Sequence, residues 1–254
     1  MRITFLGTGT SQGVPLISCK CAVCTSSDER DKRLRSSISL SIGDLYFVID
    51  SGPDFRQQML RDRATQLDAI VFTHEHKDHI AGLDDVRAFN FTMGEPMNVY
   101  CTAQVEEALR REFHYAFSEK KYPGVPEIIL NRIENAPFKI KGVEFKPIEV
   151  LHFKMKVFGY RIGNFTYITD ANYIAEEEIQ KIIGSEILVL NALRREAHPS
   201  HFTFDEALAL IARIQPRQAY LTHISHQLGK HEDVILELPE NVHLAYDGLT
   251  LELN

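Results

Sequence analysis

The sequence lacks the features that mark most non-globular chains. It has no linker rich in proline, glycine or serine, no low-complexity tract, and no repeat with a period of about 20 to 50 residues. No apolar run approaches the roughly 20 residues of a membrane span. The first apolar run, Ile3–Leu6, stops at Gly7 and is too short for the core of a signal peptide. These absences predict a cytosolic protein that folds as a single domain over residues 1–254.

Positive charge is scarce as well. The chain has 28 lysines and arginines against 35 acidic residues, a net charge of −7, which argues against a broad surface for nucleic acid. One local basic cluster, made of Arg30, Lys32, Arg33 and Arg35, is interpreted as a solvated loop or helix face, with a phosphate-binding patch as the alternative. We therefore expect neither nucleic acid nor a membrane as the partner.

Short apolar runs of the β type recur along the chain and are interleaved with helical patterns. Gly163-Asn164 between two such runs predicts a two-residue hairpin turn. Thr203, with Glu206 three residues later, predicts a capping box. The expected strands are Ile3–Leu6, Ile38–Ile42, Leu45–Ile49, Ala69–Phe72, Val99–Cys101, Val143–Val150, Val157–Ile162, Phe165–Ile168, Ile187–Leu190, Ala219–Leu221 and Val242–Ala245. The expected helices are Pro53–Arg61, Ile80–Phe89, Ala103–His114, Ala175–Ile183 and Phe204–Ile214. This pattern predicts an α/β or α+β fold with two sheets packed face to face and helices outside.

Three histidines and an aspartate gather directly after one of the expected strands, in the motif His74-x-His76-x-Asp78-His79. Side chains two residues apart in extended backbone point to the same side, so His74 and His76 can bind one cation. Asp78 and His79 lie past the bend, at the start of a helix, and can face a second cation. Imidazole and carboxylate are ligands that Zn²⁺, Mn²⁺ and Fe accept. Thr73, just before the motif, can orient one of these ligands.

One loop does not complete two metal sites, so further ligands must come from other strand ends. His152, Asp170 and His223 each follow an expected strand. Each of them taken alone is more often a core or surface residue than a ligand. Together they supply what the motif lacks, and an aspartate such as Asp170 can bridge two cations about 3.5–4 Å apart.

The cysteines are few, and three of the four fall within six residues as Cys19-x-Cys21-x-x-Cys24. Neighbours this close do not readily meet disulfide geometry, and a reducing compartment disfavours disulfides. The three thiols can instead surround a tetrahedral zinc whose fourth ligand comes from elsewhere. The alternative is three free cysteines in a loop. Cys101, inside an apolar run, is expected in the core.

The histidine motif and the separate strand-end ligands resemble those of the metallo-β-lactamase superfamily. The resemblance runs from Phe5–Pro15 to Tyr246-Asp247-Gly248. Within that superfamily the chain is most similar to the phosphoribosyl 1,2-cyclic phosphate phosphodiesterases of bacterial phosphonate degradation. The features it shares with them are Gln12-Gly13-Val14-Pro15, the cysteine motif, the segment His152–Tyr160 ending in Phe158-Gly159-Tyr160, and Leu221–Gln227. The resemblance implies an αββα sandwich of two mixed sheets flanked by helices, with metals at the sheet edges.

The same resemblance implies a role for each candidate residue. One divalent ion, zinc or manganese, would be held by His74, His76 and His152, and a second by Asp78, His79 and His223, with Asp170 bridging. A metal-activated water would be the nucleophile, which places Asp78 among the catalytic residues. His201 would protonate the leaving oxygen, with His198 as the alternative, unless His201 only flanks the next helix. His226 would complete the structural zinc site of Cys19, Cys21 and Cys24.

The resemblance favours a hydrolase of a small phosphodiester, cyclic or linear, such as phosphoribosyl cyclic phosphate. A tRNA 3′-processing endonuclease is one alternative, but its long basic arm has no counterpart in this acidic chain. A relative from pyrroloquinoline quinone biosynthesis departs from the ligand set that this chain retains. A non-catalytic metal-binding module is the alternative from another class. A homodimer is expected only because many relatives are dimers.

The residues that would bind the substrate are left open by the sequence. The segments Phe89–Pro96 and Lys120–Pro126 could shape a pocket or be plain surface loops. Arg56, Arg194 and Arg195 could bind a phosphate or be surface charges.

Overall fold

The computed structural model describes residues 1–253, and these form two compact units. The first unit consists of Met1–Leu6, Ser37–Glu134 and the C-terminal segment from Thr250. The second consists of Gly7–Ser36 and Asn135–Leu249. Two units of this kind can belong to one folding domain, so the single domain stays a prediction. Among residues 1–253, none of the helices has the length and apolar composition needed to cross a membrane.

The first unit is built on a mixed sheet of seven strands in the order β15-β1-β2-β3-β4-β5-β6. β1 pairs antiparallel with β15, and β2 with β3, whereas β3, β4, β5 and β6 run parallel to one another. The strands are β1 (Arg2–Gly7), β2 (Ser37–Ile42), β3 (Leu45–Ile49), β4 (Ala69–Val71), β5 (Met97–Cys101), β6 (Ile128–Arg132) and β15 (Thr250–Glu252).

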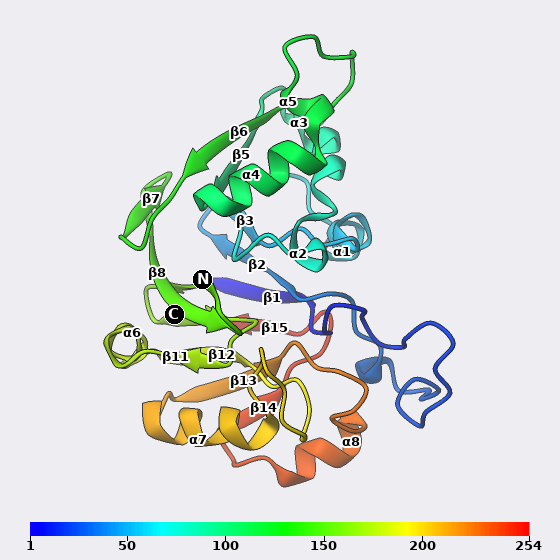
Figure 1. Cartoon of the computed structure of the whole chain (residues 1–254), viewed down its shortest axis with the longest axis vertical. Helices are drawn as coiled ribbons and strands as arrows, with labels where there is room; N and C mark the ends of the chain where they lie inside the picture. Colours follow the sequence, from blue (N-terminus) through cyan, green and yellow to red (C-terminus); the bar gives the residue numbers. More distant parts are fainter. Residues whose placement is uncertain (254) are drawn as a thin grey trace. The chain divides into compact units, whose positions relative to one another are not determined.

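Helices cover one face of this sheet (Figure 1). They are α1 (Phe55–Asp62), α2 (Lys77–Ile80), α3 (Arg87–Met93), α4 (Ala103–Glu112) and α5 (His114–Phe117), with the short 3₁₀ helix η2 (Leu83–Val86) between α2 and α3. Side chains of alternate strand residues, such as Val48, Ile70 and Val99, pack with Phe55 and Val105 into one buried core. The parallel strands are thus joined by helical crossovers, as parallel pairing requires.

The second unit repeats this plan with a mixed sheet in the order β11-β8-β9-β10-β12-β13-β14, to which β7 adds by pairing with β8. β8, β9 and β10 are antiparallel neighbours, whereas β10, β12, β13 and β14 are parallel. The strands are β7 (Phe138–Ile140), β8 (Val143–His152), β9 (Met155–Ile162), β10 (Phe165–Ile168), β11 (Tyr173–Ile174), β12 (Ile187–Asn191), β13 (Gln218–Thr222) and β14 (Val242–Leu244).

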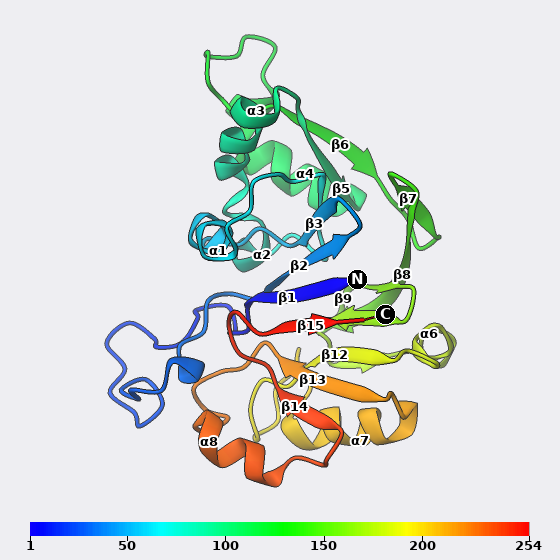
Figure 2. The ribbon, with the colours of Figure 1, turned by 180° about the vertical axis from the view of Figure 1, so that it is seen from behind.

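The helices of the second unit are α6 (Glu176–Ile182), α7 (Phe204–Ile214) and α8 (His231–Val234), accompanied by the 3₁₀ helices η1 (Glu29–Asp31) and η3 (Ile235–Glu237). Ile168, Leu190 and Leu221 from the sheet pack with Ile179 and Ile211 from α6 and α7 into a second core. The loop Gly7–Ser36 projects beside α8 (Figure 2), where the Asp31 carboxylate accepts a hydrogen bond from the His231 backbone N–H at 2.7 Å.

Most of the expected elements are confirmed. Two mixed sheets with flanking helices agree with the predicted αββα fold class. Gly163-Asn164 forms the turn between β9 and β10, with Ile162 opposite Phe165 and a φ of +57° at Gly163. Thr203 begins α7 with both hydrogen bonds of the capping box present. The strands β6, β7, β11 and β15 are absent from the sequence prediction because they are short or only half-buried, so their apolar pattern is weak.

The helix expected over Ile80–Phe89 is wrong as one continuous helix. The chain breaks at Gly82 and forms α2, η2 and α3 instead. A Cβ atom at Gly82 would lie 2.0 Å from the Gly52 carbonyl oxygen, and the Gly82 N–H donates to the Ser51 carbonyl. Close approach of the two backbones therefore interrupts the helical periodicity.

The basic cluster also differs in part from the expectation of a solvated face. Arg30 pairs with Asp28 and Lys32 with Glu29, as a surface loop would allow. Arg33 is buried, and its guanidinium donates to Thr8 Oγ1 at 2.8 Å and to the Ala245 carbonyl at 2.5 Å. Burial lowers the pKa of Arg33 to about 10. Arg33 therefore anchors the loop Gly7–Ser36 rather than offering charge to a ligand.

Candidate metal centre

The histidine motif of the first unit follows the carboxyl end of β4. His74 is buried, His76 is exposed, and Asp78 and His79 lie in the short helix α2. The ring centroid of His74 lies 4.7 Å from that of His76 and 4.1 Å from that of His79. His79 Nε2 lies 3.1 Å from Asp78 Oδ2. The structure thus brings all four predicted ligands of this loop together.

A residue that the sequence prediction missed, Asp50, orients two of these histidines. Its carboxylate lies 2.7 Å from His79 Nδ1 and accepts from the backbone N–H and the hydroxyl of Thr73 at 2.9 and 2.8 Å. Because the Thr73 hydroxyl donates to Asp50, its oxygen can accept from His74 Nδ1, which lies 3.0 Å away. Both imidazoles therefore carry their proton on Nδ1 and present the lone pair of Nε2, as metal-binding histidines do.

Thr73 contacts both Asp50 and His74, as expected of a residue that orients a ligand, and the position of Asp50 explains why it reaches both histidines. It follows β3, the parallel neighbour of β4, and is fully buried with a positive φ of +66°. Burial raises the pKa of the Asp50 carboxyl, while His79 and Thr73 act in the opposite direction. The signal in the sequence was the same as for Asp170, a polar residue that ends an apolar run.

The second unit gathers its predicted residues in the same way, at the ends of β8, β10 and β13. His152 donates from Nδ1 to the Ser200 carbonyl at 2.8 Å, which again leaves the lone pair on Nε2. Asp170 Oδ1 lies 3.0 Å from His223 Nδ1, and His223 Nε2 lies 3.2 Å from Thr10 Oγ1. Ligand atoms of His152, Asp170 and His201 all lie within 4.8 Å of one another.

His201 lies among these residues rather than at the periphery. Its ring is stacked on His223 at 4.7 Å and lies edge-on to His152 at 4.7 Å. Burial and the neighbouring histidines lower the pKa of His201 to about 3, and Nδ1 finds no hydrogen-bond partner among residues 1–253. The ring therefore packs directly against two of the candidate ligands, His152 and His223. His198, the alternative, lies 5.0 Å from the His201 ring and bonds to Ser200 instead.

A second residue missed by the sequence prediction holds the Asp170 segment in place. The Asn191 side chain, at the end of β12, accepts from the Ala171 N–H at 2.9 Å and donates to the Ala171 carbonyl at 3.0 Å. The Ala171 carbonyl also accepts from the Phe202 N–H at 2.7 Å, which links this segment to His201. Asp170 and His223 have positive φ values of +54° and +56°, a conformation that costs non-glycine residues energy and recurs at functional sites.

The cysteine motif and His226 form a separate cluster in the second unit. His226 Nδ1 lies 3.5 Å from Cys19 Sγ and 3.3 Å from Cys21 Sγ, and the Cys24 N–H donates to Cys21 Sγ. Ligands of a tetrahedral zinc lie about 3.5 Å apart for a nitrogen and a sulfur at their usual bond lengths. The hydrogen bond from the Cys24 backbone lowers the pKa of Cys21 to about 6, whereas burial raises the pKa of Cys24 to about 11. The donor set and its spacing fit a zinc ion.

The remaining candidates do not converge on these clusters. Arg195 pairs with Glu237 at 2.6 Å, and Arg194 donates to Gln227 and to carbonyls of its own loop. Arg56 is exposed on α1. The segments Phe89–Pro96 and Lys120–Pro126 border a hollow of about 200 Å³ that includes Gly94 and Gly124.

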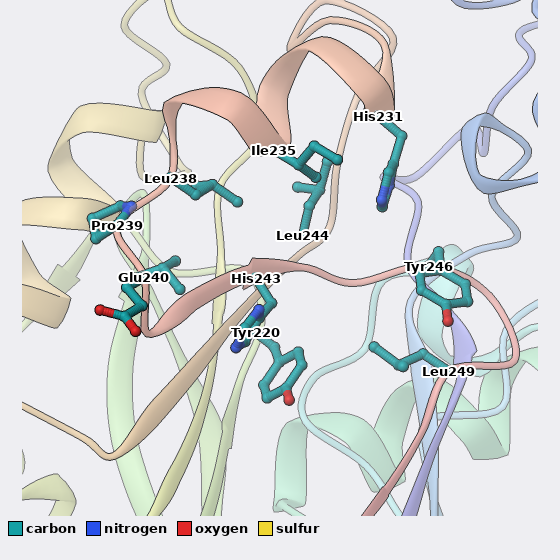
Figure 3. Close-up of a pocket in the computed structure, with 11 residues that line it drawn as sticks. Tyr220, His231, Ile235, Leu238, Pro239, Glu240, His243, Leu244, Tyr246 and Leu249 are labelled. Atoms are coloured by element: carbon teal, nitrogen blue, oxygen red, sulfur yellow. The ribbon is translucent and has the colours of Figure 1, made fainter.

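A larger hollow of about 450 Å³ lies in the second unit between α8, η3 and β14 (Figure 3). His231 at its edge lies 3.4 Å from Arg33 Nη2, and burial lowers the pKa of His231 to about 4. Its lining includes Tyr220, Ile235, Leu238, His243 and Tyr246, and none of the predicted ligands. The hollow is therefore distinct from the candidate metal centre.

Comparison with known proteins places this geometry in context. A model described as a β-lactamase superfamily domain matches residues 46–224. The crystal structure of a diphosphatase from the PhnP family superimposes with a TM-score of 0.94 at 38% identity, covering 100% of this chain and 98% of that one. Zinc-bound PqqB from Methylobacterium extorquens superimposes with a TM-score of 0.81 at 20% identity, covering 100% of both chains, and supports the fold alone.

A protein named octanoyltransferase from Porphyromonas gingivalis is 39% identical over 253 residues, which cover 98% of this chain but 51% of that protein. The chain thus spans about half the length of the curated relatives it matches. An activity named for the longer protein need not reside in the matched half.

The role of Asp50 can be tested with Asp50→Asn, which keeps the size of the side chain but replaces one acceptor oxygen by a donor. We expect the affinity for Mn²⁺ to fall about 10- to 100-fold, because His79 and Thr73 lose a shared acceptor. Titration followed by the electron paramagnetic resonance of free Mn²⁺ measures it without interference from the thiol site, which favours zinc.

The matched control is Asp62→Asn, since the Asp62 carboxylate accepts from Ser39 and Tyr46 in the same unit but contacts no predicted ligand. Equal Mn²⁺ affinity in the Asp50 and Asp62 variants would contradict the orienting role.

Proposed function

Because this chain belongs to the β-lactamase superfamily, with the fold of its metal-dependent hydrolases, we propose that it hydrolyses a small phosphodiester or diphosphate. The observation that carries the proposal is the orientation of the imidazoles of His74, His79 and His152, in each of which an acceptor lies within hydrogen-bonding distance of Nδ1, so that Nε2 can bind a cation. Phosphodiesters and diphosphates share attack at phosphorus, so the similarity to a diphosphatase supports the same chemistry.

We infer that two divalent ions, zinc or manganese, complete the site. His74, His76 and His152 would hold one ion, Asp78, His79 and His223 the other, and Asp170 would contact both. The fit rests on the donor set, since neutral imidazole and carboxylate suit both metals. Bound there, the ions would polarise the phosphoryl oxygen and lower the pKa of an attacking water.

The protein's own side chains would orient these ligands and donate a proton to the leaving group. Asp50 and Ser200 fix the rings of His79 and His152 through their Nδ1 atoms. Asn191 fixes the segment that carries Asp170. Hydrogen bonds made before the substrate arrives reduce the reorganisation that the reaction requires. His201 would donate a hydrogen bond to the departing oxygen and, in its imidazolium form, which the negative charge of a bound phosphate favours, pass it a proton.

The proposal is tested by the hydrolysis of bis-p-nitrophenyl phosphate with added Mn²⁺, within a panel of cyclic and linear phosphodiesters. We expect activity in the natural protein and a loss of at least about 100-fold in Asp78→Ala, since metal activation supplies several kcal/mol to the transition state. Lys77→Ala is the control, because Lys77 is exposed and pairs with Glu112. A metal-loaded natural protein that leaves the whole panel intact would favour a non-catalytic module.

The role of His201 is tested by changing the leaving group. A p-nitrophenolate leaves without a proton, whereas a sugar or alkyl alkoxide needs one. We expect His201→Ala to lower kcat about 100-fold or more for a dialkyl or cyclic sugar diester, and much less for the p-nitrophenyl diester. His198→Ala should leave both rates nearly unchanged. Equal losses on both substrates in the His201 variant would argue against proton donation.

We further propose that Cys19, Cys21, Cys24 and His226 hold one structural zinc. This zinc would tie the loop Gly7–Ser36 to the segment that carries His223, three residues before His226. In Cys21→Ser the purified protein should lose one equivalent of zinc and unfold at a lower temperature, because metal binding contributes to folding. Metal analysis by mass spectrometry checks it, with Cys101→Ala as the control, since Cys101 is buried in the first unit's core. Unchanged zinc in Cys21→Ser would remove the assignment.

A further inference from the structure

The hairpin turn between β8 and β9 contains an aromatic residue in an unfavourable place. His152 pairs with Met155, so Phe153 and Lys154 form a two-residue turn. Phe153 has a φ of +58°, which its Cβ makes costly and which glycine adopts readily at the first position of such turns. A bulky aromatic residue there needs a reason other than the turn itself.

Three other positive-φ residues have local explanations. Arg63 and Gln215 end α1 and α7, where the left-handed conformation is common. Lys141 forms with Gly142 the turn between β7 and β8, in which both residues have positive φ. Phe153 differs because the strained residue is large, apolar and 56% exposed. Its side chain is not part of a hydrophobic core, so core packing does not compensate for the unfavourable φ.

The turn is fixed beside the predicted ligands of the second unit. Phe153 directly follows His152, and its N–H donates to Asn172 Oδ1 at 2.7 Å. Asn172 is two residues past Asp170 and donates its own N–H to the Leu151 carbonyl. Tyr173, 54% exposed, lies opposite Leu151 in the β8–β11 pairing. One exposed aromatic side chain therefore directly follows His152, and another lies three residues after Asp170.

The chemistry of this turn suits one part of a nucleotide better than a bare sugar phosphate. A flat, exposed ring offers a face on which a base can stack, and stacking is largely insensitive to the identity of the base. The Lys154 ammonium lies 5.4 Å from the Phe153 ring centroid and adds positive charge for a phosphate group. A base-free phosphodiester has no planar ring system to stack on this aromatic face.

We propose that Phe153 is a specificity-determining residue that stacks on the base of a nucleotide-type substrate, whose phosphorus is held by the adjacent ligands. This inference rests on the proposed function and narrows its substrate class to phosphodiesters or diphosphates of nucleosides. Stacking of one base changes a binding constant by about 5- to 150-fold. The backbone strain at Phe153 is the cost of presenting the ring at this position.

The test compares two ligands that differ only by the base, adenosine 5′-monophosphate and ribose 5-phosphate, by calorimetry on the Mn²⁺-loaded protein. We expect the natural protein to bind the nucleotide at least about tenfold more tightly. Phe153→Gly should abolish this difference and leave ribose 5-phosphate binding unchanged. Its melting temperature should be equal or higher, since glycine suits the turn. Phe153→Trp should retain the difference, and Phe153→Leu, which keeps bulk without a flat face, should lose it.

Equal affinity for both ligands in the natural protein, or an equal loss for both in Phe153→Gly, would overturn the proposal. A parallel assay separates it from the proposed function, using a nucleoside 2′,3′-cyclic phosphate and a base-free ribose cyclic phosphate. Hydrolysis of both with the same kcat/KM would sustain the phosphodiesterase and refute the stacking role. Selective nucleotide binding without any hydrolysis would sustain the stacking role and refute the phosphodiesterase.

Discussion

A histidine that binds a cation through one ring nitrogen almost always donates a hydrogen bond from the other to an acceptor. The candidate centre depends on this constraint. Asp50 is the key residue in the first unit, because one buried carboxylate fixes His79 directly and His74 through Thr73. In the second unit the Ser200 carbonyl does the same for His152. Without these acceptors the rings could rotate or exchange tautomers, and the lone pairs of Nε2 would no longer be aimed.

The two units reach this result by the same architectural means. Each has a mixed sheet with a run of parallel strands, and polar residues follow the carboxyl ends of these strands, where sites in such sheets commonly lie. Asp50, Asp170 and His223 all have positive φ values, so the chain turns sharply as it leaves the strand. Such strain persists only where surrounding contacts hold it, and the hydrogen bonds of Thr73, Asn191 and Thr10 provide those contacts.

Chemistry and substrate recognition are thus assigned to different features of neighbouring segments. The ligands follow buried strands and have little freedom to vary, whereas the β8–β9 turn beside them is exposed and can carry any side chain that its backbone tolerates. Phe153 in that turn is consistent with selection for a ligand at the expense of local stability. The superfamily match accounts for the fold, and it leaves the identity of the bound molecule to residues such as this one.

The sequence by itself determined the elements with strong patterns and the residues that end them. The histidine motif, the strand-end ligands, the capping box at Thr203 and the hairpin at Gly163 depend on local spacing, and local spacing can be read directly from the chain. Tertiary structure alone decided the roles of Asp50, Asn191 and Arg33, because their partners lie 20 or more residues away. It also decided the break at Gly82, where contact with Gly52 overrides the helical pattern. Propensity and periodicity act over a few residues, whereas hydrogen bonds to buried polar groups and backbone contacts are set by packing.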